Sequence, residues 1–410
     1  MKKLLVTLSF IFAATVLLPQ PKVKTGIEVL RDSAFSVLKG KRAGLITNPT
    51  GVDSKLKATI DILNGEKSFS LTALYGPEHG VRGDYSAGDH VSTYTDPSTG
   101  LIVYSLYGAT RKPVPEMLDS VDVLVYDIQD IGSRSYTYIS TLGLAMEAAA
   151  ENNKEFVVLD RPNPLSGIKV EGNLVEDGYY SFVSQFKVPY VHGLTVGELA
   201  RFLNENGMLK NGVKCKLTVI PMQGWQRYMT FRETGLPWVP TSPHIPYMDT
   251  PFHYVATGIL GELGFISEGV GYTIPFQTFA AEWINQDTLA DKMNALNLPG
   301  VIFRPLTFKP YYGKHTGKVL HGVQIHFTDP LKADLMKIQF YFLQVHNNMY
   351  PDKNPFTNPD TSRFSMFDKV CGTSKIREIF GKEMTVRSIN AYLEKDIDAF
   401  RKATAPVLLY

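Results

Sequence analysis

Short apolar segments alternate with amphipathic segments through the first half of the chain. The apolar segments are rich in β-branched residues, as buried strands are, and they lie at Arg42–Thr47, Ser70–Tyr75, Leu101–Tyr107, Val121–Tyr126, Glu155–Leu159 and Lys216–Ile220. The segments between them have helical periodicity and lie at Ile27–Leu38, Lys57–Asn64, Tyr138–Asn152 and Val196–Asn206. Thr195 and Glu198 are spaced as a capping box for the last of these helices. This alternation predicts an α/β domain with a mostly parallel sheet covered by helices.

The pattern changes in the second half of the chain. Between Gly224 and Gly271 it is irregular and rich in Pro, Gly, Trp and His. Beyond about Ile274 the pattern predicts helices and strands again, at Asp287–Leu296, Val301–Phe308, Val319–Phe327, Leu331–Asn347 and Thr385–Lys402. We therefore predict an α/β domain over residues 23–274 and a smaller α+β domain over residues 275–410.

The N-terminal segment has the pattern of a signal peptide. Lys2 and Lys3 precede a continuous apolar run, Leu4–Leu18, and Pro19 and Pro21 follow it. We predict a signal peptide over residues 1–22 and export to the periplasm, with an uncleaved N-terminal anchor as the alternative. No later apolar run reaches the length that spans a bilayer, so no membrane contact is expected after signal removal.

Composition and charge narrow the possible functions. The 410 residues contain 42 Lys and Arg and 40 Asp and Glu, so the chain has no basic excess with which to bind nucleic acid. Its two cysteines cannot form a disulfide framework. The dinucleotide fingerprint GxGxxG does not follow the first strand, and the zinc motif HExxH is absent. We therefore expect neither a cofactor nor a metal site.

Polar clusters follow three of the predicted strands. In an open α/β sheet, ligands bind beyond the carboxyl ends of the strands. We therefore expect the clusters to meet in one cleft. Their candidate residues are Glu78, His79 and Arg82 after the second strand, Asp127, Asp130 and Arg134 after the fourth, and Asp160, Arg161 and Asn163 after the fifth.

Each cluster also has a structural interpretation. Glu78 lies in a Gly-Pro…Gly loop, where it either donates a proton from a raised pKa or pairs with Arg82. Asp127 and Asp130 either contact a substrate or hold an Asx turn. Asp160 and Arg161 form a buried pair unless Arg161 grips a substrate carboxylate.

Further candidates lie outside these three clusters. Glu171 is, with Asp127, a candidate for a second catalytic carboxylate, and His192 precedes a helix start. Trp238 and His244 lie in a proline-rich segment, and Trp225 precedes this segment in the chain. Tryptophan faces stack on sugar rings, although a tryptophan at a domain interface is as consistent with the pattern.

These motifs together resemble a known family. The strings GPEHGVRGD, YDIQDIGSRSYTY, LDRPNPLSG, VEGNLV, VHGLTVGELA, MQGWQR and TGLPWVPTSPHIP are similar to those of the NamZ-type exo-β-N-acetylmuramidases, formerly a bacterial family of unknown function. The resemblance implies a Rossmann-like catalytic domain, a smaller C-terminal auxiliary domain and an active site between them. It also implies release of terminal N-acetylmuramic acid from the non-reducing end of peptidoglycan fragments, with Glu78 as the catalytic acid.

One segment departs from the family pattern. Glu268, Gly269, Gly271 and Thr273 match it, but Val270 stands where the family has an arginine. Another amino sugar, or a peptide-bearing fragment, therefore remains open as the substrate. A non-catalytic cell-wall glycan-binding protein is the alternative function, whereas an acyl-transfer hydrolase is disfavoured because no GxSxG motif is present. The second carboxylate is expected to act as base or nucleophile, or to orient the substrate's own acetamido group.

Overall fold

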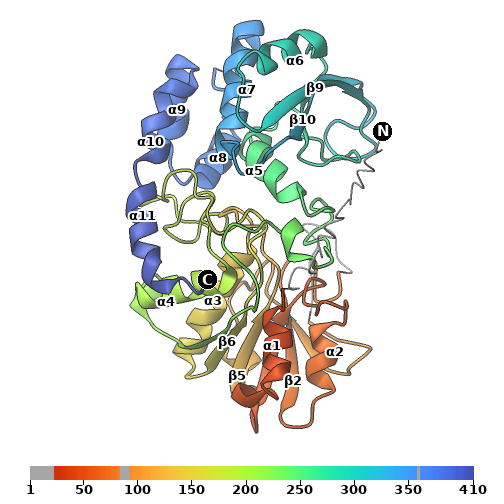
Figure 1. Cartoon of the computed structure of the whole chain (residues 1–410), viewed down its shortest axis with the longest axis vertical. Helices are drawn as coiled ribbons and strands as arrows, with labels where there is room; N and C mark the ends of the chain where they lie inside the picture. The colour runs from red at the N-terminus through yellow and green to blue at the C-terminus, as the bar shows by residue number, and fades with distance from the viewer. Residues whose placement is uncertain (1–22, 84–92, 358–360) are drawn as a thin grey trace, which may run out of the picture.

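The computed structural model describes residues 23–83, 93–357 and 361–410. The chain forms two domains that follow one another along the long axis of the molecule (Figure 1). The predicted signal peptide lies outside the described residues and stays a prediction. Within the described ranges, no helix combines the length and the apolar character needed to cross a membrane.

The first domain contains a seven-stranded sheet in the order β3-β4-β2-β1-β5-β6-β7. All neighbouring strands are parallel except the short edge strand β3, which is antiparallel to β4. The mostly parallel sheet predicted from the sequence is therefore confirmed. The strands are β1 Arg42–Thr47, β2 Ser70–Gly76, β3 Tyr94–Thr95, β4 Ile102–Ser105, β5 Val123–Asp127, β6 Glu155–Leu159 and β7 Lys216–Ile220.

Helices cover both faces of this sheet. Helices α1 (Gly26–Asp32) and α2 (Thr59–Asn64) pack on one face, and α3 (Tyr138–Glu151) and α4 (Val196–Glu205) pack on the other. The central strands are buried on both sides, which explains their continuous apolar sequences. The capping box at α4 is confirmed, since the Thr195 side chain accepts from the Glu198 N–H and the Glu198 carboxylate accepts from the Thr195 N–H.

The second domain is built on a three-stranded antiparallel sheet in the order β8-β10-β9. Helix α7 packs on this sheet, where the Phe342 ring stacks on Phe279 of β8 at 4.3 Å. The elements are α5 Thr250–Gly261, β8 Thr278–Ala281, α6 Gln286–Asn294, β9 Val301–Phe308, β10 Leu320–Phe327, α7 Leu335–Met349, α8 Phe364–Cys371, α9 Lys375–Glu383, α10 Val386–Glu394 and α11 Ile397–Thr404. The predicted α+β character of this domain is confirmed.

The region between Gly224 and Gly271 was predicted to be irregular, but it contains a regular helix, α5. Pro251 lies in its first turn, where a missing N–H costs nothing, and Phe252, Val255 and Ile259 are spaced along one face. These side chains join α7 in the apolar core of the second domain. That core therefore begins upstream of the boundary that we placed at residues 274/275.

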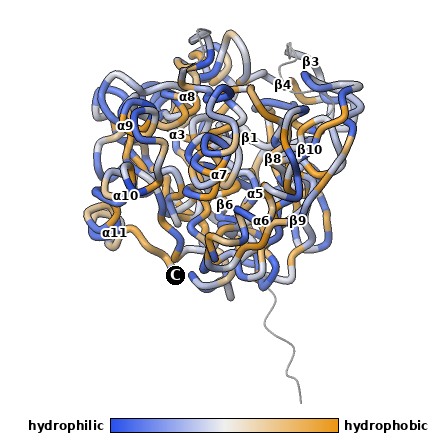
Figure 2. Tube along the Cα trace, turned by 90° about the horizontal axis from the view of Figure 1, so that it is seen from above, coloured by the Kyte–Doolittle hydropathy of each residue, from blue (hydrophilic) through white to orange (hydrophobic). Residues whose placement is uncertain are grey.

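Helices α9 to α11 run along one side of the molecule from the second domain to α4 of the first (Figure 1), and Figure 2 shows the same helices at one edge. The chain then returns to the first domain. The Tyr410 hydroxyl donates to Asp160 at 2.6 Å, and its ring packs edge-on against Trp225 with the centroids 5.1 Å apart. The two domains are thus tied together by the last helices.

Arg134 is a second tie between the domains. Its side chain is fully buried, and its guanidinium donates to the carbonyls of Asn173 and Val188 at 2.8 Å and to the carbonyl of Val370, in α8, at 3.0 Å. Burial lowers its pKa to about 10. Since its N–H groups are directed to the protein's own acceptors, Arg134 does not act at a ligand site as the sequence interpretation allowed.

Candidate active site

The loop after β2 presents Glu78 at the carboxyl edge of the sheet. His79 and Gly80 both have φ near 75°, and the Gly80 N–H donates to the Pro77 carbonyl at 3.0 Å, so the chain turns sharply. A Cβ at Gly76 would lie 3.2 Å from the Val81 nitrogen, which shows how closely the loop folds back on the strand. The turn leaves Glu78 half-buried, with its side chain in a cavity.

This cavity lies between the two domains and has a volume of about 330 Å³. We call it the interdomain cavity. The first domain supplies the Glu78 loop, the start of α3 and a proline-rich segment, and the second domain supplies α5 and the segment after it. Its lining residues are Glu78, His79, Ser135, Tyr136, Thr137, Tyr138, Ser242, Pro243, His244, Ile245, Tyr254, Glu262 and Phe276.

Glu78 has a polar neighbour but no counter-ion among the residues that the structure describes. Tyr107 makes a hydrogen bond with Glu78, and burial together with this bond raises the pKa of Tyr107 to about 12. Arg82, which the sequence offered as a salt-bridge partner, pairs instead with Asp96 at 2.7 Å. Throughout the described ranges Glu78 forms no ion pair. Its carboxyl group is therefore available to a ligand.

Glu262 is a second carboxylate in the same cavity, and sequence reasoning missed it. It is the first residue after α5, so it enters the cavity from the other domain. Burial raises its pKa, and the nearby charge of Arg363 opposes that rise. The signal that would have found Glu262 is the helical spacing of α5, which places this glutamate at a helix end.

Aromatic side chains line the interdomain cavity together with the two carboxylates. Tyr136 packs edge-on against Tyr138 and Tyr254, with ring centroids 5.0 and 5.8 Å apart. The Tyr138 hydroxyl donates to the Thr241 carbonyl at 2.6 Å, and the Ser135 hydroxyl lies 3.0 Å from that of Tyr254. These bonds hold α3, the proline-rich segment and α5 together around the cavity.

Two histidines lie in the cavity as the sequence suggested. His79 and His244 both line it. Burial lowers the pKa of His244, and the nearby His79 lowers it further. The His244 ring stacks on Tyr312 with 15° between the planes, and its Nε2 lies 3.1 Å from the Tyr312 hydroxyl. The second domain thus positions His244 through Tyr312.

The structure does not bring Asp127 to this cavity. Its carboxylate is buried and forms an ion pair with Arg161, with distances of 2.5 and 3.1 Å, and it also accepts from the Thr59 hydroxyl at 2.5 Å. A buried carboxylate needs such partners because burial without them is costly. Asp127 and Arg161 therefore hold the strand ends together, and the structural interpretation of this pair applies.

The other polar residues at the strand ends also bond to protein groups, although Oδ1 of the buried Asp130 has no hydrogen-bond partner in the described ranges. Asp160 accepts from the Thr195 hydroxyl at 2.8 Å and from the Gly197 N–H at 2.8 Å. Asn163 donates to the Leu194 carbonyl at 3.0 Å. Asp130 accepts from the Gly132 N–H at 2.7 Å. The predicted meeting of carboxylates from three strand ends in one cleft is therefore wrong, because only the β2 cluster opens into the interdomain cavity.

Four further candidates lie away from the interdomain cavity. Glu171 forms an ion pair with Lys169 at 2.9 Å and lines a different cavity beside α7 and α10. His192 is buried, with Nε2 3.8 Å from Asp130. Trp238 packs on Phe231 and donates to the Ile245 carbonyl at 3.2 Å, so it supports the lining segment from behind.

Glu268 is the fourth of these candidates. Burial raises its pKa to about 7, and the charge of Glu262 adds to this rise, whereas Lys314 and Arg363 oppose it. Its carboxyl packs against Gly261, at the end of α5. Glu268 thus lies behind Glu262 and does not line the interdomain cavity.

The described residues hold no cluster of three or more His, Cys, Asp or Glu that could bind a metal ion.

Comparison with known proteins places this geometry in a family. The N-terminal model of the exo-β-N-acetylmuramidase NamZ matches residues 43–249, and the C-terminal model matches residues 252–410. The peptidoglycan β-N-acetylmuramidase NamZ of Bacillus subtilis is 45% identical over 391 residues, which are 95% of this chain and 92% of that protein. The chain belongs to the NamZ exo-β-N-acetylmuramidase family.

Crystal structures agree with this assignment. A DUF1343 family protein from Bacteroides fragilis superposes with a TM-score of 0.92 at 57% identity, over 96% of this chain and all of that one. A second DUF1343 protein of the same organism gives 0.77 at 28% identity, over 95% and 99% of the two chains. The family and the glycosidase activity predicted from the motifs are therefore confirmed. The two NamZ models divide within two residues of the start of α5, where the second core begins.

Proposed function

We propose that this NamZ family member releases terminal N-acetylmuramic acid from the non-reducing end of peptidoglycan fragments. The family and the name of the Bacillus subtilis relative support this substrate. The observation that carries the proposal is the interdomain cavity, where Glu78 of the first domain and Glu262 of the second line the same space. Glycoside hydrolysis uses a pair of carboxyl groups on either side of the scissile bond.

In the proposed reaction, Glu78 gives its proton to the glycosidic oxygen as the anomeric carbon gains positive charge. Glu262 supplies the second carboxylate, in place of Asp127 and Glu171, whose carboxylates are paired elsewhere. Tyr136 and Tyr138 form a wall against which a sugar ring packs. His79 and His244 lie where they can hydrogen-bond the polar substituents of that ring.

One observation favours the reverse assignment of the two carboxyl groups. Burial raises the pKa of Glu262, and a raised pKa is the property of a general acid near neutral pH. The hydrogen bond that Tyr107 donates to Glu78 is consistent with Glu78 as the second carboxylate of the reaction. The dependence of the rate on the leaving group separates the two assignments, because an activated aglycone needs no proton.

The test uses purified protein, a MurNAc–GlcNAc disaccharide and mass spectrometry for free N-acetylmuramic acid. Wild type is expected to release the sugar, and Glu78→Gln is expected to lower kcat on the disaccharide by about 10²- to 10⁴-fold. If Glu78 is the acid, the same variant keeps most of its activity on an aryl glycoside with a good leaving group. If it loses both activities while Glu262→Gln spares the aryl glycoside, the roles are reversed.

Binding of the disaccharide without any release by wild type would overturn the enzymatic proposal and leave a glycan-binding protein. Release of a different amino sugar from a matching substrate would show that the enzyme has another specificity, as Val270 in place of the family's arginine allows. The proposed glycoside hydrolysis would still stand.

A further inference from the structure

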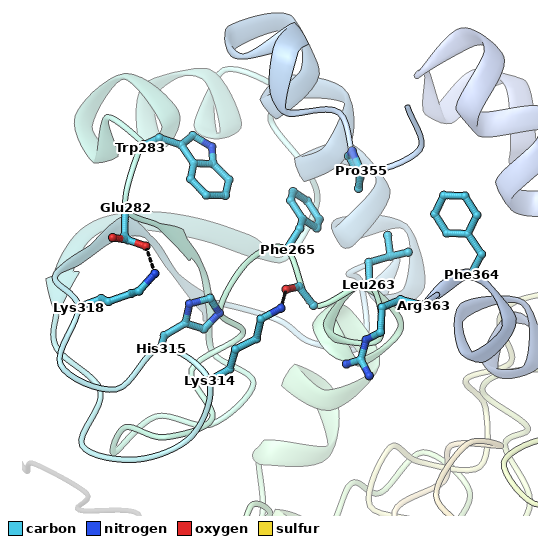
Figure 3. A pocket seen from close by; sticks show the side chains of 11 residues that line it. Leu263, Phe265, Glu282, Trp283, Lys314, His315, Lys318, Pro355, Arg363 and Phe364 are labelled. Carbon is cyan, nitrogen blue, oxygen red and sulfur yellow. Dashed lines mark hydrogen bonds and ion pairs between the residues drawn. The ribbon is translucent and has the colours of Figure 1, made fainter. Parts of the chain in front are cut away.

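A second cavity lies directly beside the interdomain cavity and carries positive charge. We call it the basic pocket (Figure 3), and it has a volume of about 380 Å³. Glu262 lines the interdomain cavity, and Leu263 and Gly264 line the basic pocket. Because consecutive Cα atoms are ~3.8 Å apart, the two cavities lie within about the length of a sugar residue of each other along this segment.

The lining of the basic pocket contains more basic than acidic side chains. Lys314 and Lys318 come from the segment between β9 and β10, and Arg363 precedes α8. Glu282 is the carboxylate of its lining, and it pairs with Lys318 at 2.6 Å. Neither Lys314 nor Arg363 forms an ion pair with any residue in the described ranges. Both cations act on the buried Glu268 through their charge, and Arg363 also acts on Glu262, but neither is directly paired with these carboxylates. Cations without a direct ion pair are a usual basis for binding an anion.

Lys314 and Arg363 approach the same point of the backbone. A Cβ at Gly264 would lie 3.1 Å from Lys314 Nζ and 3.3 Å from an Arg363 guanidinium nitrogen. Lys314 also donates to the Gly264 carbonyl, which fixes its position. Gly264 has φ 63° and so belongs to the turn after α5. Two cations from separate segments are thus held close together on the residue next but one to Glu262.

The pocket also offers apolar surface. Trp283, Phe265 and Phe364 line it with the basic side chains, and Figure 3 shows Phe265 between the Lys314 side and the Arg363 side. The segment that carries Lys314 also carries Tyr312, which stacks on His244 of the interdomain cavity. One segment therefore lines the basic pocket and also supports a histidine of the interdomain cavity.

We propose that the basic pocket binds a carboxylate-bearing part of the substrate beyond the sugar that is released. This inference rests on the proposed function. Peptidoglycan fragments carry carboxylates on the lactyl ether of further muramic acid residues and on attached peptides. Lys314 and Arg363 bind the carboxylate, while the aromatic side chains cover the neighbouring apolar surface. The pocket thus selects fragments with an anionic leaving group over those with a neutral one.

The experiment compares three substrates that share the terminal N-acetylmuramic acid. The first is the MurNAc–GlcNAc disaccharide, whose leaving group is a neutral sugar as unactivated as that of the other two. The second is the MurNAc–GlcNAc–MurNAc trisaccharide, and the third is the same trisaccharide with a peptide on the reducing-end sugar. The variants are Lys314→Gln, Arg363→Gln and the double variant, with Lys332→Gln as a matched control because Lys332 is exposed outside the pocket.

The measured quantity is the ratio of kcat/KM between an anionic and a neutral substrate. Arg363 also acts on the pKa of Glu262, which affects all three substrates alike, so the ratio isolates the pocket. The double variant is expected to lower this ratio about tenfold, as the loss of charge-assisted contacts does, and Lys332→Gln is expected to leave it unchanged. The peptide-bearing trisaccharide has no free lactyl carboxylate on its reducing-end sugar, because the amide bond to the peptide uses it. A decrease with the unsubstituted trisaccharide alone therefore identifies the lactyl carboxylate, a decrease with the peptide-bearing one alone identifies the peptide, and a decrease with both shows that the pocket binds either carboxylate.

An unchanged ratio for both trisaccharides would overturn the inference. If wild type released no sugar from any of the three substrates, the proposed function itself would fail, so the two failures are distinguishable. Thermal unfolding of each variant confirms that the exposed substitutions leave the fold intact.

Discussion

The ends of β2 and β5 have equally polar sequences but opposite surroundings. Asp127, at the end of β5, is buried and paired with Arg161, whereas Glu78, just beyond β2, has no counter-ion in the described structure and lines a cavity. The difference comes from the neighbours. The β6 end supplies an arginine to Asp127, while Arg82, the arginine nearest Glu78 in the sequence, is taken by Asp96. A carboxylate at a strand end is therefore a candidate for catalysis only when the fold leaves it unpaired.

The largest stability effect is expected for Asp127→Ala. The substitution leaves the Arg161 guanidinium buried without its partner, which costs about 3–5 kcal/mol in the free energy of unfolding. Urea unfolding measures this cost, and Asp122→Ala is the control because the Arg42–Asp122 pair is exposed and therefore contributes little to stability. Activity per folded molecule should stay near that of wild type. A thousandfold loss of activity per folded molecule would instead show that Asp127 takes part in catalysis.

A smaller effect is expected from the titration of Asp160. Burial raises its pKa to about 6 from an ordinary value of 3.8. The folded state then holds the proton more tightly than the unfolded state, so the free energy of unfolding falls as pH rises from about 4 to 6 and is level above that range. The fall is on the order of 3 kcal/mol.

The measurement for Asp160 is urea unfolding of wild type and Asp160→Asn at several pH values. The stability of wild type relative to the variant should decrease between pH 4 and pH 6. A difference that does not change with pH would mean that Asp160 ionises as readily in the folded state as in the unfolded state.

The smallest expected effect is that of Trp238→Phe. It removes the hydrogen bond to the Ile245 carbonyl, which supports the cavity lining, at a cost of about 1 kcal/mol. Because His244 lies beside Ile245, KM for the disaccharide should rise a few-fold. The control is Trp225→Phe, since the buried Trp225 indole N–H has no hydrogen-bond partner within the described ranges. Equal effects of the two substitutions on KM would show that the Trp238 bond does not position the lining.

The sequence predicted the parallel strands of the first domain to within two residues at each end, because the central strands are buried and form continuous apolar runs. The prediction missed β3, because a strand of two residues is too short to show an alternation of apolar and polar positions. It also missed α5, because the helix lies in a region rich in Pro and Gly that obscures its helical spacing. Three of the predicted site residues line the interdomain cavity. Glu78, His79 and His244 could be found because they lie in loops with distinctive motifs.

Glu262 could not be found in the same way. It comes from the second domain, and its position depends on how α5 packs across the domain boundary. The internal partners of Asp127, Asp160 and Glu171 were equally hidden, because Thr59, Tyr410 and the Met336 N–H are distant in sequence. Local pattern identifies polar clusters, but only the tertiary fold determines which of them stay unpaired.

The central claim is that the two carboxyl groups of the reaction come from different domains. The most direct test is kcat on the MurNAc–GlcNAc disaccharide for Glu262→Gln and Glu171→Gln, each corrected for the folded fraction. We predict that Glu262→Gln loses at least about 100-fold, while Glu171→Gln, whose carboxylate is paired with Lys169, stays within a few-fold of wild type. Full activity of Glu262→Gln together with an inactive Glu171→Gln would contradict this account.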